Sequence, residues 1–420
     1  MAATGGGPAS DVGTSPVPAA SGGWLRSGFW AVAYAFLIIM AAATLPSPLY
    51  GLYRARDGLS ALTITVAFAI FAAGTISVLL RESVIAARLG RRGTMIAGVL
   101  VMMVAMGVLA IWKDLAGLLI GRLITGVSVG LAAGAAITYL VELRLRADPK
   151  ASPVPARTIG TSVTVGGLGL GPLIGGFLAQ WVAQPLTVPY LVFLGLGAIA
   201  LAGLWFAPET GKPAVRGAAG SQSAGPRRKV TLPVPAAAGT LAAFAANGLF
   251  AGLSGLFLVT LLHEPSHALS GVALFLVFAS GVVSQLATTP LKAPQVLALG
   301  SVSMIVGLAL LVISVRLSTP ELSLFMIGGA LIGAGSGAVY KGTTGIVLEA
   351  TPPESRVAVT SEQLIALYVG LSVPVIGAGI ALDRGASGPD TVLVFAIVVA
   401  LGVAGSGWAL LRGKGAPATT

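Results

Sequence analysis

Twelve long apolar segments constrain this sequence more than any other feature. They span about residues 27–45, 61–80, 94–112, 115–141, 158–182, 187–207, 239–261, 269–289, 295–315, 321–348, 357–381 and 391–411. Most are close to the length of about 20 residues that a helix needs to cross a bilayer. Only 9% of the residues are charged, whereas soluble domains carry about 25%. The pattern therefore predicts an all-α integral membrane protein and excludes an ordinary water-soluble enzyme.

A polar stretch divides the twelve segments into two sets of six. We expect a disordered tail (1–23), an N-terminal six-helix bundle (24–207), a linker (208–237), a C-terminal six-helix bundle (238–412) and a short second tail (413–420). The first tail has no apolar core of the kind found in cleavable signal peptides. The expected fold is thus two six-helix bundles in one chain.

The distribution of basic residues predicts the orientation in the membrane. Of the 25 Lys and Arg residues, 18 fall in the tails, the linker and the even-numbered loops, and five fall in the odd-numbered loops. Basic residues favour cytoplasmic loops. We therefore expect a multi-pass protein of the cell membrane with both termini in the cytoplasm, and this explains the net charge of +11 without nucleic-acid binding.

Three segments of the first half recur in the second half, at offsets of 210, 207 and 202 residues. The matched pairs include Phe68 with Phe278, Gly126 with Gly333, and Pro172 with Pro374. Parallel repeats of six helices are typical of transporters whose site lies between the halves near the membrane midplane.

A glycine-rich motif lies in the fifth apolar segment, with Gly167, Gly171, Pro172, Gly175 and Gly176 in the pattern G-x-x-x-G-P-x-x-G-G. It resembles the antiporter motif of proton-coupled drug exporters in the major facilitator superfamily. Glycines allow close helix packing, and Pro172 removes one backbone donor. The alternative is a packing helix with no bearing on the direction of transport.

The loop after the second segment resembles the signature loop of the same superfamily through Arg88, Gly90, Arg91 and Arg92. Ser83 stands where the family has its first Gly, and Ala87 where it has Asp. In the family, this Asp latches the outward-facing state. The resemblance thus implies a resting state shifted toward inward-facing, unless the loop is only a basic turn.

Two further features resemble the family: Pro208-Glu209-Thr210 after the sixth segment, and the Leu45–Tyr50 turn, which looks like that of actinobacterial members. The resemblance covers about residues 24–412. It implies a monomeric twelve-helix major facilitator fold, and alternating access that exports a small hydrophobic drug or natural product in exchange for protons. A facilitator or importer of the same fold is the alternative.

In the family, helices 1, 4, 7 and 10 line the cavity. Polar residues on the matching segments are Tyr34, Arg122, Thr125, Asn247 and Lys341, and these are the candidates for substrate binding or coupling. Arg122 and Lys341 could instead extend to the membrane interface, and Tyr34 and Asn247 could form bonds between helices. With one deep arginine and no deep acid, neutral or anionic substrates are expected over cations.

No cofactor or metal site is expected. His263-Glu264-Pro265-Ser266-His267 fits H-E-x-x-H, but Pro265 interrupts the helix that a zinc peptidase needs. The chain has no Cys and no further His. A membrane metalloenzyme is therefore a remote alternative, and the segment is better interpreted as a loop in which Ser266 or Ser270 starts the next helix. No ATP-binding motif occurs, so transport needs a gradient of an ion or of substrate.

Overall fold

The computed structural model describes residues 22–210 and 231–413, and this part of the chain is all-helical. Its helices are α1 (Gly22–Thr44), α2 (Tyr50–Asp57), α3 (Ala61–Leu79), α4 (Glu82–Ile111), α5 (Leu115–Ala147), α6 (Val154–Trp181), α7 (Val188–Trp205), α8 (Val234–Thr260), α9 (His267–Ala287), α10 (Ala293–Arg316), α11 (Leu322–Ala350), α12 (Arg356–Asp383) and α13 (Gly388–Leu411). Most of the expected tails and linker (1–21, 211–230 and 414–420) lies outside the described residues.

Twelve helical segments in the described residues are long and apolar enough to cross a membrane, which confirms the expected helices. The boundaries of several helices differ from those expected. Helix α1 begins at Gly22 and α8 at Val234, inside the expected tail and linker, and α5 continues to Ala147. These extensions lie beyond the apolar segments, so hydrophobicity alone did not predict them.

Local chemistry accounts for two of the boundaries. The Gly117 backbone N–H donates to Asp114 Oδ1 at 2.9 Å, which starts α5 and lowers the pKa of the Asp114 carboxyl. Pro46 and Pro48 follow the end of α1, and a proline cannot donate the backbone bond that would continue a helix. The chain therefore turns through the 3-10 segment Ser47–Leu49 into the short helix α2.

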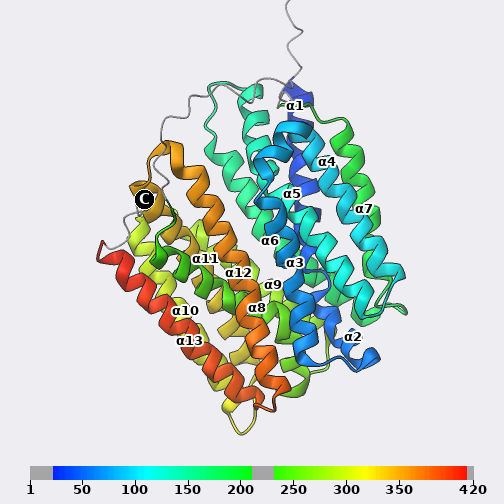
Figure 1. The fold of residues 1–420 in the computed structure, drawn as a ribbon, viewed down its shortest axis with the longest axis vertical. Helices are drawn as coiled ribbons and strands as arrows, with labels where there is room; N and C mark the ends of the chain where they lie inside the picture. Colours follow the sequence, from blue (N-terminus) through cyan, green and yellow to red (C-terminus); the bar gives the residue numbers. More distant parts are fainter. Residues whose placement is uncertain (1–21, 211–230, 414–420) are drawn as a thin grey trace, which may run out of the picture.

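The helices form two bundles that lie side by side in Figure 1. The N-bundle contains α1 to α7 and the C-bundle α8 to α13. We call the end at which α1 begins and α13 finishes the terminal end, and the other the opposite end. Two seams join the bundles, α6 against α9 and α3 against α12. The sequence repeat relates the seams, because α3 matches α9 and α6 matches α12.

The seams are tightest at the opposite end. A Cβ atom added to Gly176 of α6 would lie 2.5 Å from the His267 carbonyl oxygen and 3.0 Å from Gly271 Cα of α9, so this approach requires glycine. At the other seam, the Ala61 N–H donates to Asp383 Oδ1 at 3.0 Å.

The amide oxygen of Gln180 accepts bonds from the N–H groups of His267 (2.9 Å) and Ala268 (3.4 Å) and from the Ser266 hydroxyl (3.3 Å). These bonds and the bond from Ala61 to Asp383 join side chains of one bundle to the other bundle at this opposite end.

Candidate functional site

A cleft of about 460 Å³ opens between the two bundles toward the terminal end. We call it the terminal cleft. Its lining comes from α6, from the last turns of α9 and the residues after it, and from α11. The polar members are Arg157, Thr158, Thr161, Ser162, Gln285, Thr289, Tyr340, Lys341 and Thr344. Because α6 and α9 touch at the opposite end and diverge from there, the cleft follows from the closed seam.

The terminal cleft has a positive electrostatic character. Arg157 of α6 and Lys341 of α11 lie on facing bundles, and no Asp or Glu lines the cleft. The Lys341 ammonium donates to the Gln285 carbonyl oxygen and lies 3.4 Å from the hydroxyls of Thr288 and Thr289. Gln285 is in the last turn of α9, where carbonyl oxygens lack helical partners and attract cations. These contacts fix Lys341 on the wall of the cleft.

Of the five candidate substrate or coupling residues, only Lys341 lines the terminal cleft. Tyr34 is half-buried, and its hydroxyl donates to the Leu196 carbonyl oxygen of α7 at 3.4 Å. Asn247 is 3% exposed, and among the described residues its Oδ1 atom accepts no hydrogen bond. Thr125 is fully buried and donates to the Gly121 carbonyl oxygen of its own helix at 2.7 Å.

Arg122 lies inside the N-bundle, and its side chain has an exposed fraction of 0%. Its candidate role in substrate binding or coupling stays a prediction. Its guanidinium donates to the Ala43 carbonyl oxygen, and at 3.4 Å to those of Ala67 and Phe68. It also lies 4.8 Å from the centre of the Phe71 ring. No carboxylate is within ion-pair distance in the described part of the chain.

These contacts give Arg122 a clear structural task. Ala43 is in the last turn of α1, so its carbonyl oxygen has no helical partner. Arg122 of α5 satisfies it while also bonding to α3, and the Thr44 hydroxyl donates to the Leu168 carbonyl oxygen of α6 at 2.8 Å. The break after α1 is thereby held by three neighbouring helices.

The glycine-rich motif of α6 packs against both bundles. Cβ atoms added to Gly167, Gly171 and Gly175 would clash with α1 or Leu45 just after it, the closest being 1.9 Å from the Ala41 carbonyl oxygen at Gly171. Gly176 and the Pro172 carbonyl oxygen approach α9 instead. The motif therefore positions α6 between α1 and the C-bundle.

The four signature residues were expected in a loop, but they lie in the first turns of α4 and are held within the N-bundle. Gly90 has φ 71° and ψ 178°, a conformation that favours glycine and kinks α4. The Glu209 carboxylate accepts hydrogen bonds from the N–H groups of Arg91 (3.0 Å) and Arg92 (3.2 Å). Arg91 also pairs with Glu142 at 3.4 Å. Arg88 is exposed.

The H-E-x-x-H segment is a turn that leads into α9. His263 has a positive φ of 57°, and Ser266 caps the helix by accepting from the Leu269 N–H at 3.1 Å. Ser266 starts the helix, as the sequence suggested. The described residues contain no cluster of three or more His, Cys, Asp or Glu side chains.

Sequence reasoning missed Arg157, Thr158, Thr161 and Ser162, which line the cleft from the first turns of α6. A signal was present, because these polar residues recur at intervals of four, which places them on one side of a helix. Arg157 directly precedes the apolar segment 158–182, so hydrophobicity alone places it in a loop.

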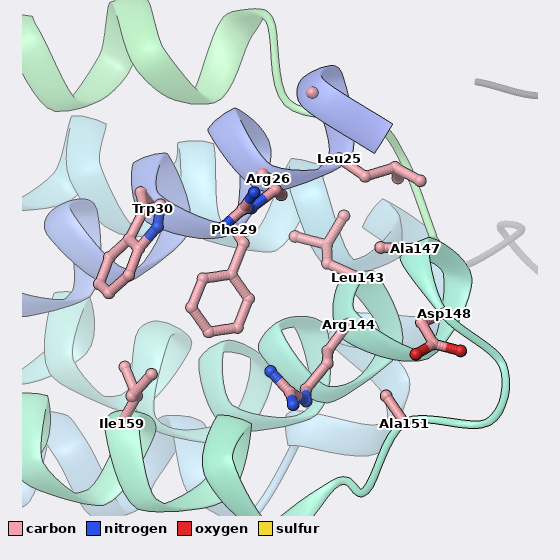
Figure 2. Close-up of a pocket in the computed structure, with 11 residues that line it drawn as sticks. Leu25, Arg26, Phe29, Trp30, Leu143, Arg144, Ala147, Asp148, Ala151 and Ile159 are labelled. Atoms are coloured by element: carbon pink, nitrogen blue, oxygen red, sulfur yellow. The ribbon is translucent and has the colours of Figure 1, made fainter. Parts of the chain in front are cut away.

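A second hollow, of about 530 Å³, lies at the terminal end among α1, α5 and α6. Figure 2 shows its lining, which includes Arg26, Phe29, Trp30, Arg144 and Asp148. All of it belongs to the N-bundle, so this hollow is not on a path between the bundles.

A model of the family described as Major Facilitator Superfamily matches residues 32–294 of the chain. Among solved structures, the chain is similar to a crystal structure of a mutant of the nucleoside transporter NupG, with a TM-score of 0.69 and 11% sequence identity. The match covers 92% of this chain and 99% of that one. At this identity the likeness shows the fold alone. No curated protein matches the sequence.

Proposed function

The chain belongs to the major facilitator superfamily and is a multi-pass membrane transporter, and from this premise we propose that it exports a small, fairly hydrophobic molecule through the terminal cleft. The substrate class is a neutral or anionic drug or natural product, and protons are the proposed counter-ion. The terminal end is proposed to face the cytoplasm of a bacterial cell, as the distribution of basic residues favours. In that orientation the structure is inward-facing.

The observation that carries this proposal is the terminal cleft itself. It lies between the bundles, carries Arg157 and Lys341, and has no carboxylate in its lining. A cation would meet like charge there, whereas a carboxylate or phenolate would meet two positive groups. The apolar lining residues, among them Val282, Leu286 and Leu348, suit a hydrophobic body.

The proposed exchange for protons is supported by the glycine-rich motif of α6, which resembles that of proton-coupled exporters. No carboxylate lines the terminal cleft, so protons would have to bind to a carboxylate elsewhere in the described residues. Glu142 accepts from the Thr210 hydroxyl at 2.6 Å, and Glu362 accepts from the Leu232 N–H at 2.6 Å. Both groups lie toward the terminal end.

Transport into inverted membrane vesicles tests the proposal. A panel of matched aromatic carboxylates, neutral esters and quaternary amines would be offered with and without an imposed pH gradient. We expect uptake of esters or carboxylates that rises with an acidic vesicle interior. Preferential uptake of the cations would refute the assignment of substrate charge.

The alternative is a facilitator or importer on the same fold. The absence of carboxylates from the cleft lining favours this alternative, because no obvious proton site lies beside the substrate. The same vesicles separate the two: a facilitator equilibrates its substrate without accumulation and ignores the pH gradient.

A further inference from the structure

The hollow among α1, α5 and α6 lies at the depth of the membrane interface. Around it, Trp24 and Trp30 are largely exposed, as are Trp205 and Phe206 at the end of α7. The Trp24 indole N–H donates to the Phe206 carbonyl oxygen at 2.8 Å, which fastens the start of α1 to α7. Aromatic side chains at helix ends mark the headgroup region of a bilayer. The hollow is therefore placed to meet lipid headgroups.

Two guanidinium groups from different helices line this hollow. Arg26 comes from α1 and is exposed, and Arg144 comes from the last turn of α5. Arg144 Nε donates to the Ser152 carbonyl oxygen at 2.9 Å, which orients the group and leaves its Nη atoms available. Neither arginine has an ion-pair partner within residues 22–210 and 231–413.

One acidic side chain also lines the hollow. Asp148 accepts through Oδ1 from the Lys150 N–H at 3.0 Å, so it caps its own loop. It lies to one side of the hollow in Figure 2. With two cations and one anion, the lining keeps a net positive charge.

The rest of the lining is apolar. Leu25, Phe29, Leu143 and Ile159 contribute to it, and the Phe29 ring packs edge-on against Trp30 at 5.4 Å between centroids. Trp30 is 60% exposed. In Figure 2, Phe29 lies between the two arginines on one side and Trp30 and Ile159 on the other. A ligand with a negative head and a hydrocarbon body matches this division.

We propose that this hollow binds the phosphodiester headgroup of an anionic glycerophospholipid. Arginine forks form paired hydrogen bonds with phosphate oxygens, and basic pockets between transmembrane helices are known sites for lipid headgroups. The first carbons of the acyl chains lie along Phe29, Trp30 and Ile159. The lipid joins α1, α5 and α6 at one end of the N-bundle. This site is independent of the proposed substrate and direction of transport.

Native mass spectrometry of the full chain in detergent tests the proposal, with dioleoyl phosphatidylglycerol and dioleoyl phosphatidylcholine as probes. The test variant is Arg26→Gln with Arg144→Gln. The matched control is Lys292→Gln with Arg412→Gln, which removes two exposed cations from the same end of the C-bundle. We expect phosphatidylglycerol to bind the wild type and the control, and to bind the test variant about tenfold more weakly.

Two further arms make the result decisive. The variant Arg26→Lys with Arg144→Lys keeps both charges but loses the paired donors of the guanidinium groups. It should therefore bind phosphatidylglycerol with intermediate affinity. Glycerol 3-phosphate at equal concentration should not displace the lipid. Equal loss in the control variant, equal binding of the two lipids, or displacement by glycerol 3-phosphate would each overturn the proposal.

Discussion

The two bundles differ most in where each places its intramembrane cation. Arg122 in α5 corresponds to Gly329 in α11 at the repeat offset of 207 residues, and Lys341 in α11 corresponds to Gly134 in α5. Each cation donates to a carbonyl oxygen in the last turn of another helix, α1 for Arg122 and α9 for Lys341.

The surroundings of the two cations separate their tasks. Arg122 is sealed between helices of one bundle, whereas Lys341 lies on the wall of the terminal cleft. At Gly329, the Phe250 ring occupies the space next to the backbone, and an added Cβ would lie 2.9 Å from it. The comparison teaches that charge and repeat position alone do not predict surroundings: a similar capping contact is sealed inside one bundle and lies on the wall of a cleft in the other.

The largest effect is expected from Arg122→Ala. The change leaves the carbonyl oxygen of Ala43 buried without a partner, which we expect to cost about 3 kcal/mol and to abolish gradient-driven transport. Thermal unfolding in detergent and vesicle uptake measure the two effects. Arg122→Lys keeps the charge but not the forked geometry, so it should retain part of the activity.

The repeat offers a control for this prediction. Gly329→Ala has only to displace the Phe250 ring and should cost about 1 kcal/mol while transport continues. Normal transport by Arg122→Ala would show that Arg122 does not hold the break after α1 in the way that its contacts suggest.

Lys341→Met should have the next largest effect, and it should depend on the charge of the substrate. Loss of the cleft cation is expected to raise the KM for anionic substrates about tenfold, or 1.4 kcal/mol, and to leave neutral substrates unchanged. Initial uptake rates over a range of concentrations give this value. Lys292→Met, outside the cleft, is the control, and an equal effect on neutral and anionic substrates would place Lys341 in a structural role.

A smaller effect is expected on the balance between the inward-facing and outward-facing states. Ala87→Asp restores the acidic group of the signature loop, and a carboxylate facing a helix N-terminus across the bundles is worth about 0.3–2 kcal/mol. The outward-facing population should rise by up to about tenfold. Spin labels at the terminal ends of the two bundles would report the distance. An unchanged distance distribution would mean that this loop is only a basic turn.

The smallest effect is expected from Tyr34→Phe. The Tyr34 hydroxyl bonds to α7 at 3.4 Å, away from the terminal cleft. Its loss should cost about 0.6 kcal/mol, a typical value for hydrogen bonds between membrane helices. Thermal unfolding should change little and KM not at all; a large change in KM would place Tyr34 in the substrate path.

The fold was predictable from the sequence because the bilayer imposes one length on every span. The repeat pairs α6 with α12, and the structure places each of these helices in one of the two seams. The sequence placed Arg122 within a membrane span but could not predict its contacts, because a buried cation can face a cavity or bind carbonyl oxygens. Arg157 was missed for a different reason: it lies where α6 extends beyond its apolar segment, so hydrophobicity assigned it to a loop.

The most direct test of the central claim is labelling of a single cysteine in the terminal cleft. The chain has no Cys, so Thr161→Cys on α6 provides a unique thiol, and Ser323→Cys, exposed near the start of α11, provides a control at the opposite end. A membrane-impermeant thiol reagent would be added to inverted and to right-side-out vesicles. We predict that Thr161→Cys reacts in inverted vesicles, that transported anions slow this reaction, and that Ser323→Cys reacts only in right-side-out vesicles. Reaction of Thr161→Cys only in right-side-out vesicles, or at a rate that no transported compound changes, would contradict the account.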